Sequence, residues 1–459
     1  MPQQTYFINN AFLDEGWAEN VRLSIDEKGF ISSLQKNVTA EHSDQRLGTV
    51  IPGLVNCHSH AFQRAMAGLT EYQHSPTDTF WSWRRTMYRF ANLVSPDDLQ
   101  DIASYLYLEM IKQGYTSIAE FHYVHHQPNG TPYACASKLS RSIINAANIA
   151  GINLTLLPVL YMNAGFDGQP LLDEQRRFGN SVARYIDIQN DATQYCAHQH
   201  QHNVGVALHS LRAVPVEPMN EVINHFVKKT SSCPIHIHIS EQTQEVEQSI
   251  RSLGKRPIDW LLDNHVIDQQ WCLVHATHMT PQETTALAKS GATVGICPTT
   301  EANLGDGFFP LREYLDQGGH ISIGSDGNTC TNPMEEIRLL EYGQRLLTRS
   351  RNISSDDTQP HTGTNLYGRC LDGGGRAIGQ KTGALKLGYR ADLVVLDENS
   401  ADLATVTPDS ILDVLIFGTS QSLIKDVMVS GIWKITHYHH ADEKRIKNRF
   451  ISATKALRQ

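Results

Sequence analysis

Eight short apolar runs recur along the middle of the chain, and they constrain its fold more than any other feature. They lie at 54–58, 116–121, 152–159, 204–209, 234–240, 271–275, 292–298 and 320–326. Stretches that carry helix-capping residues separate them, such as Ser95-Pro96 and the Thr280-Pro281-Gln282-Glu283 capping box. Eight strands alternating with helices predict an α/β fold of the (β/α)8 TIM-barrel type. An open doubly wound sheet is the alternative, but it needs a glycine-rich turn after the first strand, which NCHSHAFQ lacks.

The two ends of the chain have a different pattern. Short strand-like runs divided by polar turns lie at 5–8 and 21–25, and the pattern returns in GALKLGYRADLVVLDENS, VLIFG and IKDVMVSGIWKI. We therefore expect residues 1–52 and 385–435 to form one small composite β-sandwich domain. The barrel then occupies 53–384, and a helical C-terminal tail occupies 436–459.

Composition excludes several classes of protein. A hydrophobic fraction of 40% and a charged fraction of 19% over 459 residues indicate a globular chain. The net charge of −9 argues against nucleic acid or an anionic membrane as the main partner. Eight cysteines without a CxxC pair indicate neither a disulfide framework nor a cysteine zinc site. MPQQTYFINN lacks the basic and apolar parts of a signal peptide, so we expect a cytoplasmic protein.

Metal-ligating side chains stand where the predicted strands end, which is where barrel enzymes place their chemistry. The first run ends in His58-Ser59-His60, whose two imidazoles share a face of an extended segment. Later runs end in His238, His275 and Asp326. Three of these imidazoles together with the carboxylate suit zinc, with an open position for water.

These motifs resemble a known family. PGLVNCHSHAFQRA, HIHISEQ, LVHATH, GSDGN and GALKLGYRADLVVLD resemble the amidohydrolase superfamily, in its zinc-dependent deaminase branch, over essentially the whole chain. More narrowly, HAFQRAMAG, FWSWRRTMYRFA, EFHYVHH and CPTTEANLGDG are similar to the formimidoylglutamate deiminases of that branch. The resemblance implies hydrolysis of N-formimino-L-glutamate to N-formyl-L-glutamate and ammonia, in histidine degradation, by a zinc-activated water.

The resemblance also assigns the metal site. It implies one Zn²⁺ per chain, held by His58, His60, His238 and Asp326. It makes Glu241 and His275 the catalytic pair, while Asp326 orients or accepts the proton of the attacking water. Two-metal relatives use a carboxylated lysine near the end of the fourth strand, and 204–212 contains no lysine, which favours one metal. For Glu120, a structural hydrogen-bonding role is favoured over that of a second-metal ligand.

The implied substrate is a small dicarboxylate, which an acidic protein must hold with placed donors. Arginine suits this task because its planar fork binds carboxylates bidentately. The resemblance supports a set of contacts to the glutamate portion, namely Gln63, Arg84, Tyr123, His209 and Arg212. Without it, the sequence does not select Arg84 over Arg85 or Arg89. We also expect a homodimer.

Three other hypotheses compete with this one. A sister deaminase acting on a guanine- or adenosine-type base shares the metal set, but an uncharged ring does not require Arg84 and Arg212. A non-catalytic barrel should have lost a ligand or Glu241, and this chain retains them. Cleavage to glutamate and formamide would give different products.

Other histidines are expected to lie outside the site. His198, His200 and His202 are interpreted as a solvated loop, and His236 as a hydrogen-bonded core residue.

Overall fold

The eight apolar runs form the parallel strands of a barrel. The structure is a computed structural model, and it describes residues 4–72, 80–199, 201–227 and 232–459. The fourth run is divided at Gly205 into two short strands, and a Cβ at this glycine would lie 2.7 Å from side-chain atoms of Leu157 and Pro234. The strands are β5 (Leu54–Ser59), β6 (Tyr115–His122), β7 (Asn153–Leu160), β8 (His202–Val204), β9 (Val206–Leu208), β10 (Ile235–Ile239), β11 (Trp271–His275), β12 (Thr293–Ile296) and β13 (His320–Ile323). They follow one another in chain order around the sheet, which confirms the predicted barrel.

The barrel closes between its first and last strands through the residues that carry the predicted site. β13 ends at Ile323, three residues before Asp326, so the last strand is shorter than its apolar run. Asp326 then donates its backbone N–H to the carbonyl of His58 at 3.0 Å and accepts the N–H of His60 at 3.1 Å. The carboxyl ends of β5 and β13 are therefore held together at the candidate ligands themselves.

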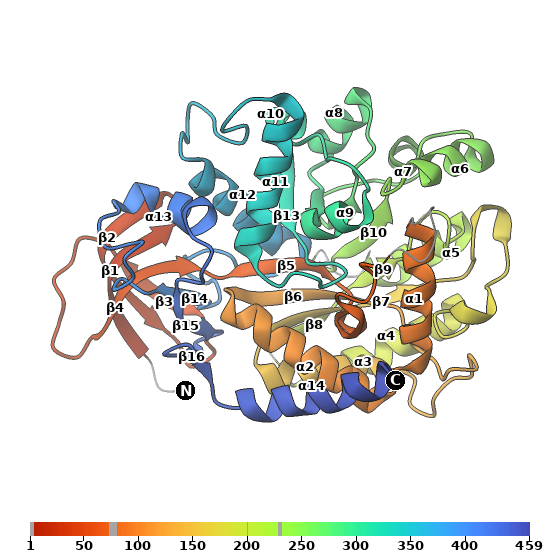
Figure 1. The fold of residues 1–459 in the computed structure, drawn as a ribbon, viewed down its shortest axis with the longest axis horizontal. Helices are drawn as coiled ribbons and strands as arrows, with labels where there is room; N and C mark the ends of the chain where they lie inside the picture. Colours follow the sequence, from red (N-terminus) through yellow and green to blue (C-terminus); the bar gives the residue numbers. More distant parts are fainter. Residues whose placement is uncertain (1–3, 73–79, 200, 228–231) are drawn as a thin grey trace.

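Helices cover the outside of the barrel, as Figure 1 shows. The capping residues predicted at Ser95 and Thr280 are in place, since each forms a capping box. The Asn332 side chain also caps a helix, by accepting the N–H of Met334. The helices that surround the strands are α1 (Phe80–Leu93), α2 (Pro96–Lys112), α3 (Lys138–Ala150), α4 (Val182–Cys196), α5 (Val216–Val222), α6 (Thr243–Leu253), α7 (Pro257–Asn264), α8 (Pro281–Ser290), α9 (Pro298–Leu304), α10 (Leu311–Asp316), α11 (Pro333–Thr348) and α12 (Thr362–Ala377). The apolar faces of these helices and of the strands form one continuous core.

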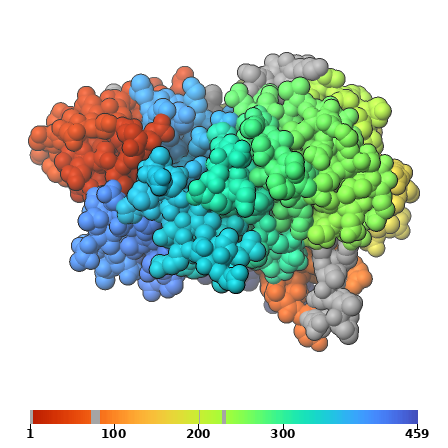
Figure 2. Space-filling model, turned by 90° about the horizontal axis from the view of Figure 1, so that it is seen from above, coloured from red at the N-terminus to blue at the C-terminus, as the bar shows by residue number. Residues whose placement is uncertain are grey.

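A second sheet combines an N-terminal segment with a segment near the C-terminus, and these two segments lie together at one end of the molecule (Figure 2). Its order is β17-β16-β15-β14-β4-β1-β2-β3. Tyr6 of β1 and Trp433 of β16 have ring centroids 5.9 Å apart although three strands separate β1 from β16, so the sheet curls over its own small core. The strands are β1 (Gln4–Leu13), β2 (Gly16–Ile25), β3 (Ile31–Gln35), β4 (Gln45–Pro52), β14 (Leu393–Leu396), β15 (Ile424–Val429), β16 (Ile432–Thr436) and β17 (His439–His440). The domain boundaries given above stay predictions.

One apolar run was assigned to the wrong element. VLIFG was expected to join the second sheet, but 414–418 is a helical turn that continues α13 (Ile411–Asp413), with Leu415 and Ile416 buried. Five apolar residues cannot by themselves distinguish a strand from a buried helical turn.

The C-terminal tail ends in a helix, α14 (Glu443–Leu457), which packs along α2. Phe450 stacks on Tyr105 with ring centroids 4.1 Å apart, and Lys112 pairs with Glu443 at 2.7 Å. Among the described residues, no helix combines the length and the apolar character that a membrane span requires.

Candidate metal centre and active site

Three imidazoles and one carboxylate converge at the carboxyl end of the barrel. The Nε2 atom of His58 lies 3.2 Å from that of His60 and 3.0 Å from that of His238. Asp326 Oδ1 lies 3.1 Å from His60 Nε2 and 3.4 Å from His58 Nε2. All four residues are buried, and their ligand atoms lie within 4.8 Å of one another. The cluster is a His/His/His/Asp metal site.

The geometry of this cluster fits a small divalent cation. Two nitrogens bound tetrahedrally to one zinc ion at 2.0–2.1 Å lie about 3.3 Å apart, close to the separations found here. The outer nitrogens of two of the three imidazoles are occupied: His60 Nδ1 donates to the Phe121 carbonyl at 2.8 Å, and His238 Nδ1 donates to the His209 carbonyl at 3.0 Å. These bonds leave the Nε2 lone pairs facing the centre, as metal-ligating histidines require.

Burial keeps the imidazoles of His58 and His238 unprotonated. It lowers the pKa of His58 to about 3 and holds the pKa of His238 well below its usual value. Both rings are therefore neutral near pH 7, which is the form that ligates metals.

The backbone at the ends of three strands adopts left-handed conformations. The φ angles are 52° at Ser240, 71° at His275 and 42° at Asp326, and none of these residues is glycine. Such conformations cost energy and are concentrated at functional sites, where the surrounding structure enforces them. Here the turn at Ser240 precedes Glu241, and the other two turns place His275 and Asp326 at the same centre.

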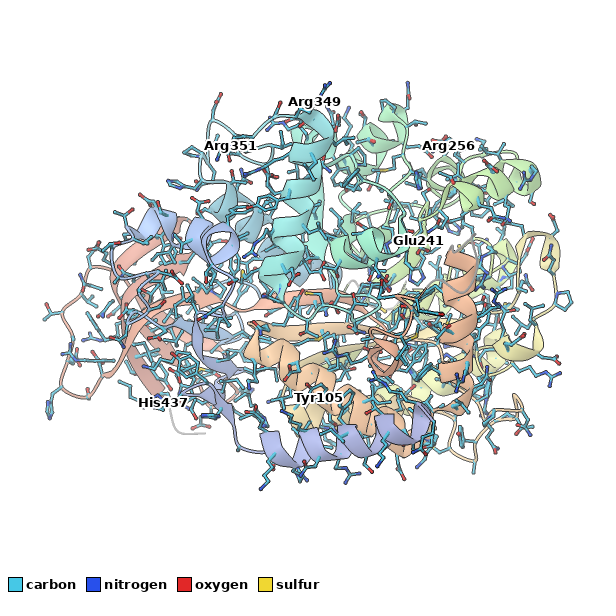
Figure 3. The ribbon with its side chains drawn as sticks, in the orientation of Figure 1. Tyr105, Glu241, Arg256, Arg349, Arg351 and His437 are labelled. Atoms are coloured by element: carbon cyan, nitrogen blue, oxygen red, sulfur yellow. The ribbon has the colours of Figure 1, made fainter. Side chains whose placement is uncertain are left out.

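Glu241 and His275 lie beside the metal site. His275 Nε2 is 3.9 Å from Glu241 Oε1 and 3.8 Å from Asp326 Oδ2, while its Nδ1 is 3.3 Å from Glu301 Oε1. Burial opposes the charged form of His275, but Glu241 and the other nearby carboxylates outweigh it and raise its pKa to about 10. Burial also raises the pKa of Glu241, which makes this carboxylate a stronger base than an exposed one. Glu241, which is labelled in Figure 3, follows the end of β10 by two residues.

The loop that carries Glu241 is fixed by a partly buried acid. The Glu245 carboxylate accepts the backbone N–H of Ser240 at 3.1 Å and that of Glu241 at 2.9 Å. These two bonds satisfy the backbone of the left-handed turn after β10 and hold Glu241 toward the pocket.

One pocket joins the metal site to the predicted substrate contacts. Its walls contain every predicted site residue except His58, which is fully buried. Arg84 lines it half-buried, whereas Arg85 and Arg89 are exposed and outside it, so the structure distinguishes three arginines that the sequence could not. The lining residues are His60, Gln63, Trp83, Arg84, Met87, Tyr88, Tyr123, Tyr161, Phe178, His209, Arg212, His238, Glu241, His275, Leu304 and Asp326.

Polar contacts arrange the wall of the pocket opposite the catalytic pair. Gln63 Nε2 donates to the Tyr123 hydroxyl at 3.0 Å. Arg84 and Arg212 donate to the same Tyr161 oxygen, at 3.3 Å and 3.2 Å. The wall therefore presents two guanidinium groups that meet at one oxygen, and such groups can donate charge-assisted hydrogen bonds to a carboxylate.

Tyr161, Gln175 and Glu301 are among the residues around the site that the sequence analysis missed. Tyr161 directly follows β7, so the strand-end rule that selected the histidines could have found it. Gln175, whose Nε2 donates to Tyr161 at 2.8 Å, lies in a connection far from any strand end. Glu301 lies on α9, where it bonds both His275 and the N–H of Cys297, and its sequence position indicates only a helix.

Glu120 has the structural role that was expected of it. Its two carboxylate oxygens accept the N–H of Ala61 and the hydroxyl of Tyr107, at 2.6 Å and 3.1 Å.

The predicted solvated histidine loop was partly wrong. His198 is exposed and His200 lies outside the described residues, but His202 is buried, with its imidazole bonded to Leu154 and Asn148. His236 is a buried core residue that donates to the Ala377 carbonyl at 2.7 Å, as predicted.

Comparison with protein families finds two matches along the chain. Residues 49–434 match the Amidohydrolase family, and residues 4–48 match the N-terminal domain of formimidoylglutamate deiminase HutF. A formimidoylglutamate deiminase from Pseudomonas aeruginosa is 46% identical over 445 residues, covering 97% of each chain. A 5-methylthioadenosine/S-adenosylhomocysteine deaminase from Natronomonas pharaonis is 24% identical over 387 residues, 83% of this chain and 80% of that protein.

Solved structures share the fold over its full length. An amidohydrolase from Brucella melitensis superposes with a TM-score of 0.95 at 40% identity, covering 99% of this chain and 100% of that one. An adenosine deaminase from Xanthomonas campestris with bound zinc superposes with a TM-score of 0.80 at 18% identity, covering 99% and 98%, which is a likeness of fold.

Proposed function

Because this chain belongs to the amidohydrolase family, we propose that it hydrolyses N-formimino-L-glutamate to N-formyl-L-glutamate and ammonia, a step of histidine degradation. The relation to the Pseudomonas aeruginosa enzyme supports this substrate, since it extends over 97% of the chain. The observation that carries the proposal is the pocket itself, in which Arg84 and Arg212 face the same space as Glu241, His275 and the metal site. A substrate with carboxylates at one end and a formimino group at the other matches that arrangement.

The metal site would hold one Zn²⁺ per chain through His58, His60, His238 and Asp326. When bound, zinc supplies a water molecule whose pKa is lowered from 15.7 to about 7, so that a nucleophile is available at neutral pH. The same nitrogen and oxygen donors also accept other divalent ions. The choice of zinc therefore rests on structures of similar fold that contain it, such as the Xanthomonas campestris adenosine deaminase.

Three side chains would manage the protons of the reaction. Asp326 directs Oδ1 at the imidazoles and leaves Oδ2 on the side of His275, where it can orient the proton of the attacking water. Glu241 takes up that proton and returns it to the departing formimino nitrogen. The water oxygen bonds to the formimino carbon, and the bond from that carbon to its terminal nitrogen breaks. The C=O bond forms as the remaining hydroxyl proton also passes to that nitrogen, which leaves as ammonia. His275 Nε2 steadies the attacked group.

The glutamate portion would be held by Gln63, Arg84, Tyr123, His209 and Arg212. Burial, together with Arg212 and Arg84, holds the pKa of His209 well below its usual value, so this ring contributes as a neutral donor or acceptor. The two arginines then supply the positive charge for the dicarboxylate.

An ammonia-release assay with formiminoglutamate, guanine and adenosine as separate substrates, combined with metal analysis, tests the proposal. We expect ammonia from formiminoglutamate alone and formylglutamate as the second product. Ammonia from a purine with none from formiminoglutamate, or formamide as a product, would overturn it. The cytoplasmic location and the homodimer stay predictions.

A further inference from the structure

Three N–H donors converge on the single phenol oxygen of Tyr161 at the wall of the pocket. Arg84 Nη2, Arg212 Nη1 and Gln175 Nε2 lie 3.3, 3.2 and 2.8 Å from it. Tyr161 is 2% exposed, and no residue of this group except the two arginines was expected from the sequence to be in the site. A hydroxyl oxygen has only two acceptor lone pairs, so the three donors exceed what a neutral phenol can accept.

The hydroxyl proton of Tyr161 is therefore directed elsewhere. Among the described residues, each hydrogen bond recorded at this oxygen is one that it accepts. Burial raises the pKa of Tyr161, but Arg212 and Arg84 outweigh burial, so the pKa is lowered and the O–H group becomes a strong donor. An acceptor that brings negative charge into the pocket would satisfy both the excess N–H groups and this hydroxyl.

The position of Tyr161 does not depend on its oxygen alone. Its ring packs edge-on against His209, with centroids 4.4 Å apart, and lies tilted against Phe178, with centroids 5.9 Å apart. Arg212 has a second bond, to the Ala164 carbonyl at 2.9 Å. Removal of the hydroxyl should therefore leave the ring and the backbone in place.

We infer that Tyr161 is a specificity-determining residue, whose phenol oxygen draws Arg84 and Arg212 into one site for a substrate carboxylate. Without that oxygen, two cations side by side in a half-buried pocket repel each other. With it, the guanidinium groups stay together, and an incoming carboxylate accepts their remaining N–H groups and the Tyr161 hydroxyl. The inference rests on the proposed function for the identity of the carboxylate substrate.

The test is Tyr161→Phe, assayed for turnover of formiminoglutamate and, by calorimetry, for binding of glutarate to the zinc-loaded protein. Loss of a hydrogen bond to a charged group predicts an increase of about 10- to 100-fold in both KM and the glutarate Kd, with kcat within a few fold. Tyr195→Phe is the matched control: Tyr195 also contacts an arginine, Arg141, and donates to Asn145, but it lies outside the pocket. We expect it to change neither constant.

The outcomes separate this inference from the proposed function. Unchanged KM and Kd in Tyr161→Phe, or a fall in kcat with KM unchanged, would overturn the inference and leave the function. The opposite result is also possible: the wild-type protein releases no ammonia from formiminoglutamate, yet it binds glutarate more tightly than Tyr161→Phe does. That result would overturn the proposed function and leave the inference. If Tyr161→Phe does not fold, a crystal structure of the wild-type protein with glutarate tests the same point: we expect one glutarate carboxylate to accept from Arg84, Arg212 and the Tyr161 hydroxyl, and a carboxylate that does not contact the Tyr161 hydroxyl would overturn the inference.

Discussion

Replacing Glu241 by glutamine separates proton transfer from the other properties of the site. Glutamine has the same length and fits the same half-buried position, 3.9 Å from His275 Nε2, but its amide cannot take up a proton. Glu241 is not one of the four residues whose ligand atoms face the metal centre, so zinc should be retained. General acid–base catalysis contributes on the order of 10²- to 10⁴-fold to a rate, or about 3–5 kcal/mol of barrier. We expect kcat to fall by that factor while KM changes little.

The assay is ammonia release at saturating formiminoglutamate, with zinc measured by mass spectrometry on the same samples. Glu247→Gln is the matched control, because Glu247 lies on α6 with its side chain 66% exposed and undergoes the same loss of charge. A Glu241→Gln variant with kcat within about threefold of wild type would refute the assigned proton transfer. A variant that loses its zinc would instead show that Glu241 is a ligand.

Three further predictions concern substrate binding, the packing of Gly324 against the metal ligand His58, and a buried acid. Arg212→Met should raise KM about 10- to 100-fold in steady-state kinetics, whereas the exposed Arg85→Met should not; equal effects would contradict the assignment. Gly324→Ala places a Cβ 2.8 Å from His58 Cβ and 2.9 Å from the His58 carbonyl oxygen, which strains the fold by about 1–3 kcal/mol. Zinc content and Tm should therefore both fall, and unchanged values would count against this packing. Burial raises the pKa of Glu336 from 4.5 to about 8. The contribution of this side chain to the stability of the fold is therefore fully present below pH 4.5 and is lost as the pH rises through 8. The Tm of wild type relative to Glu336→Gln should therefore fall from about pH 5 to pH 9, and a constant difference would contradict it.

The barrel could be predicted from the sequence because its signal is long and repeated. Eight apolar runs separated by capped helices leave few alternatives, and each run that ends in a histidine or an aspartate marks the catalytic end of the barrel. A single short run is weaker evidence. VLIFG at 414–418 is apolar enough for a strand, but its place in the long connection between β14 and β15 makes it a helical turn.

The residues of the candidate site that lie at strand ends could be predicted from the sequence. His58, His238 and Asp326 follow from the strand pattern, whereas the pocket also uses residues such as Gln175, which no local pattern marks. The choice of Arg84 over its neighbours depends on how α1 is rotated against the barrel, and that rotation is a property of tertiary packing. The Tyr161 contacts depend on three connections meeting in space, so the sequence could give at most the position of Tyr161 after β7.

Anomalous diffraction at the zinc absorption edge, from crystals of the zinc-loaded protein, tests the central claim most directly. The account predicts one strong peak, about 2.0–2.2 Å from the Nε2 atoms of His58, His60 and His238 and from an Asp326 oxygen. A second buried group, His275, Cys297 and Glu301, also has ligand atoms within 4.8 Å of one another. A peak at that group alone, or no peak at the first, would contradict the assignment of the metal centre.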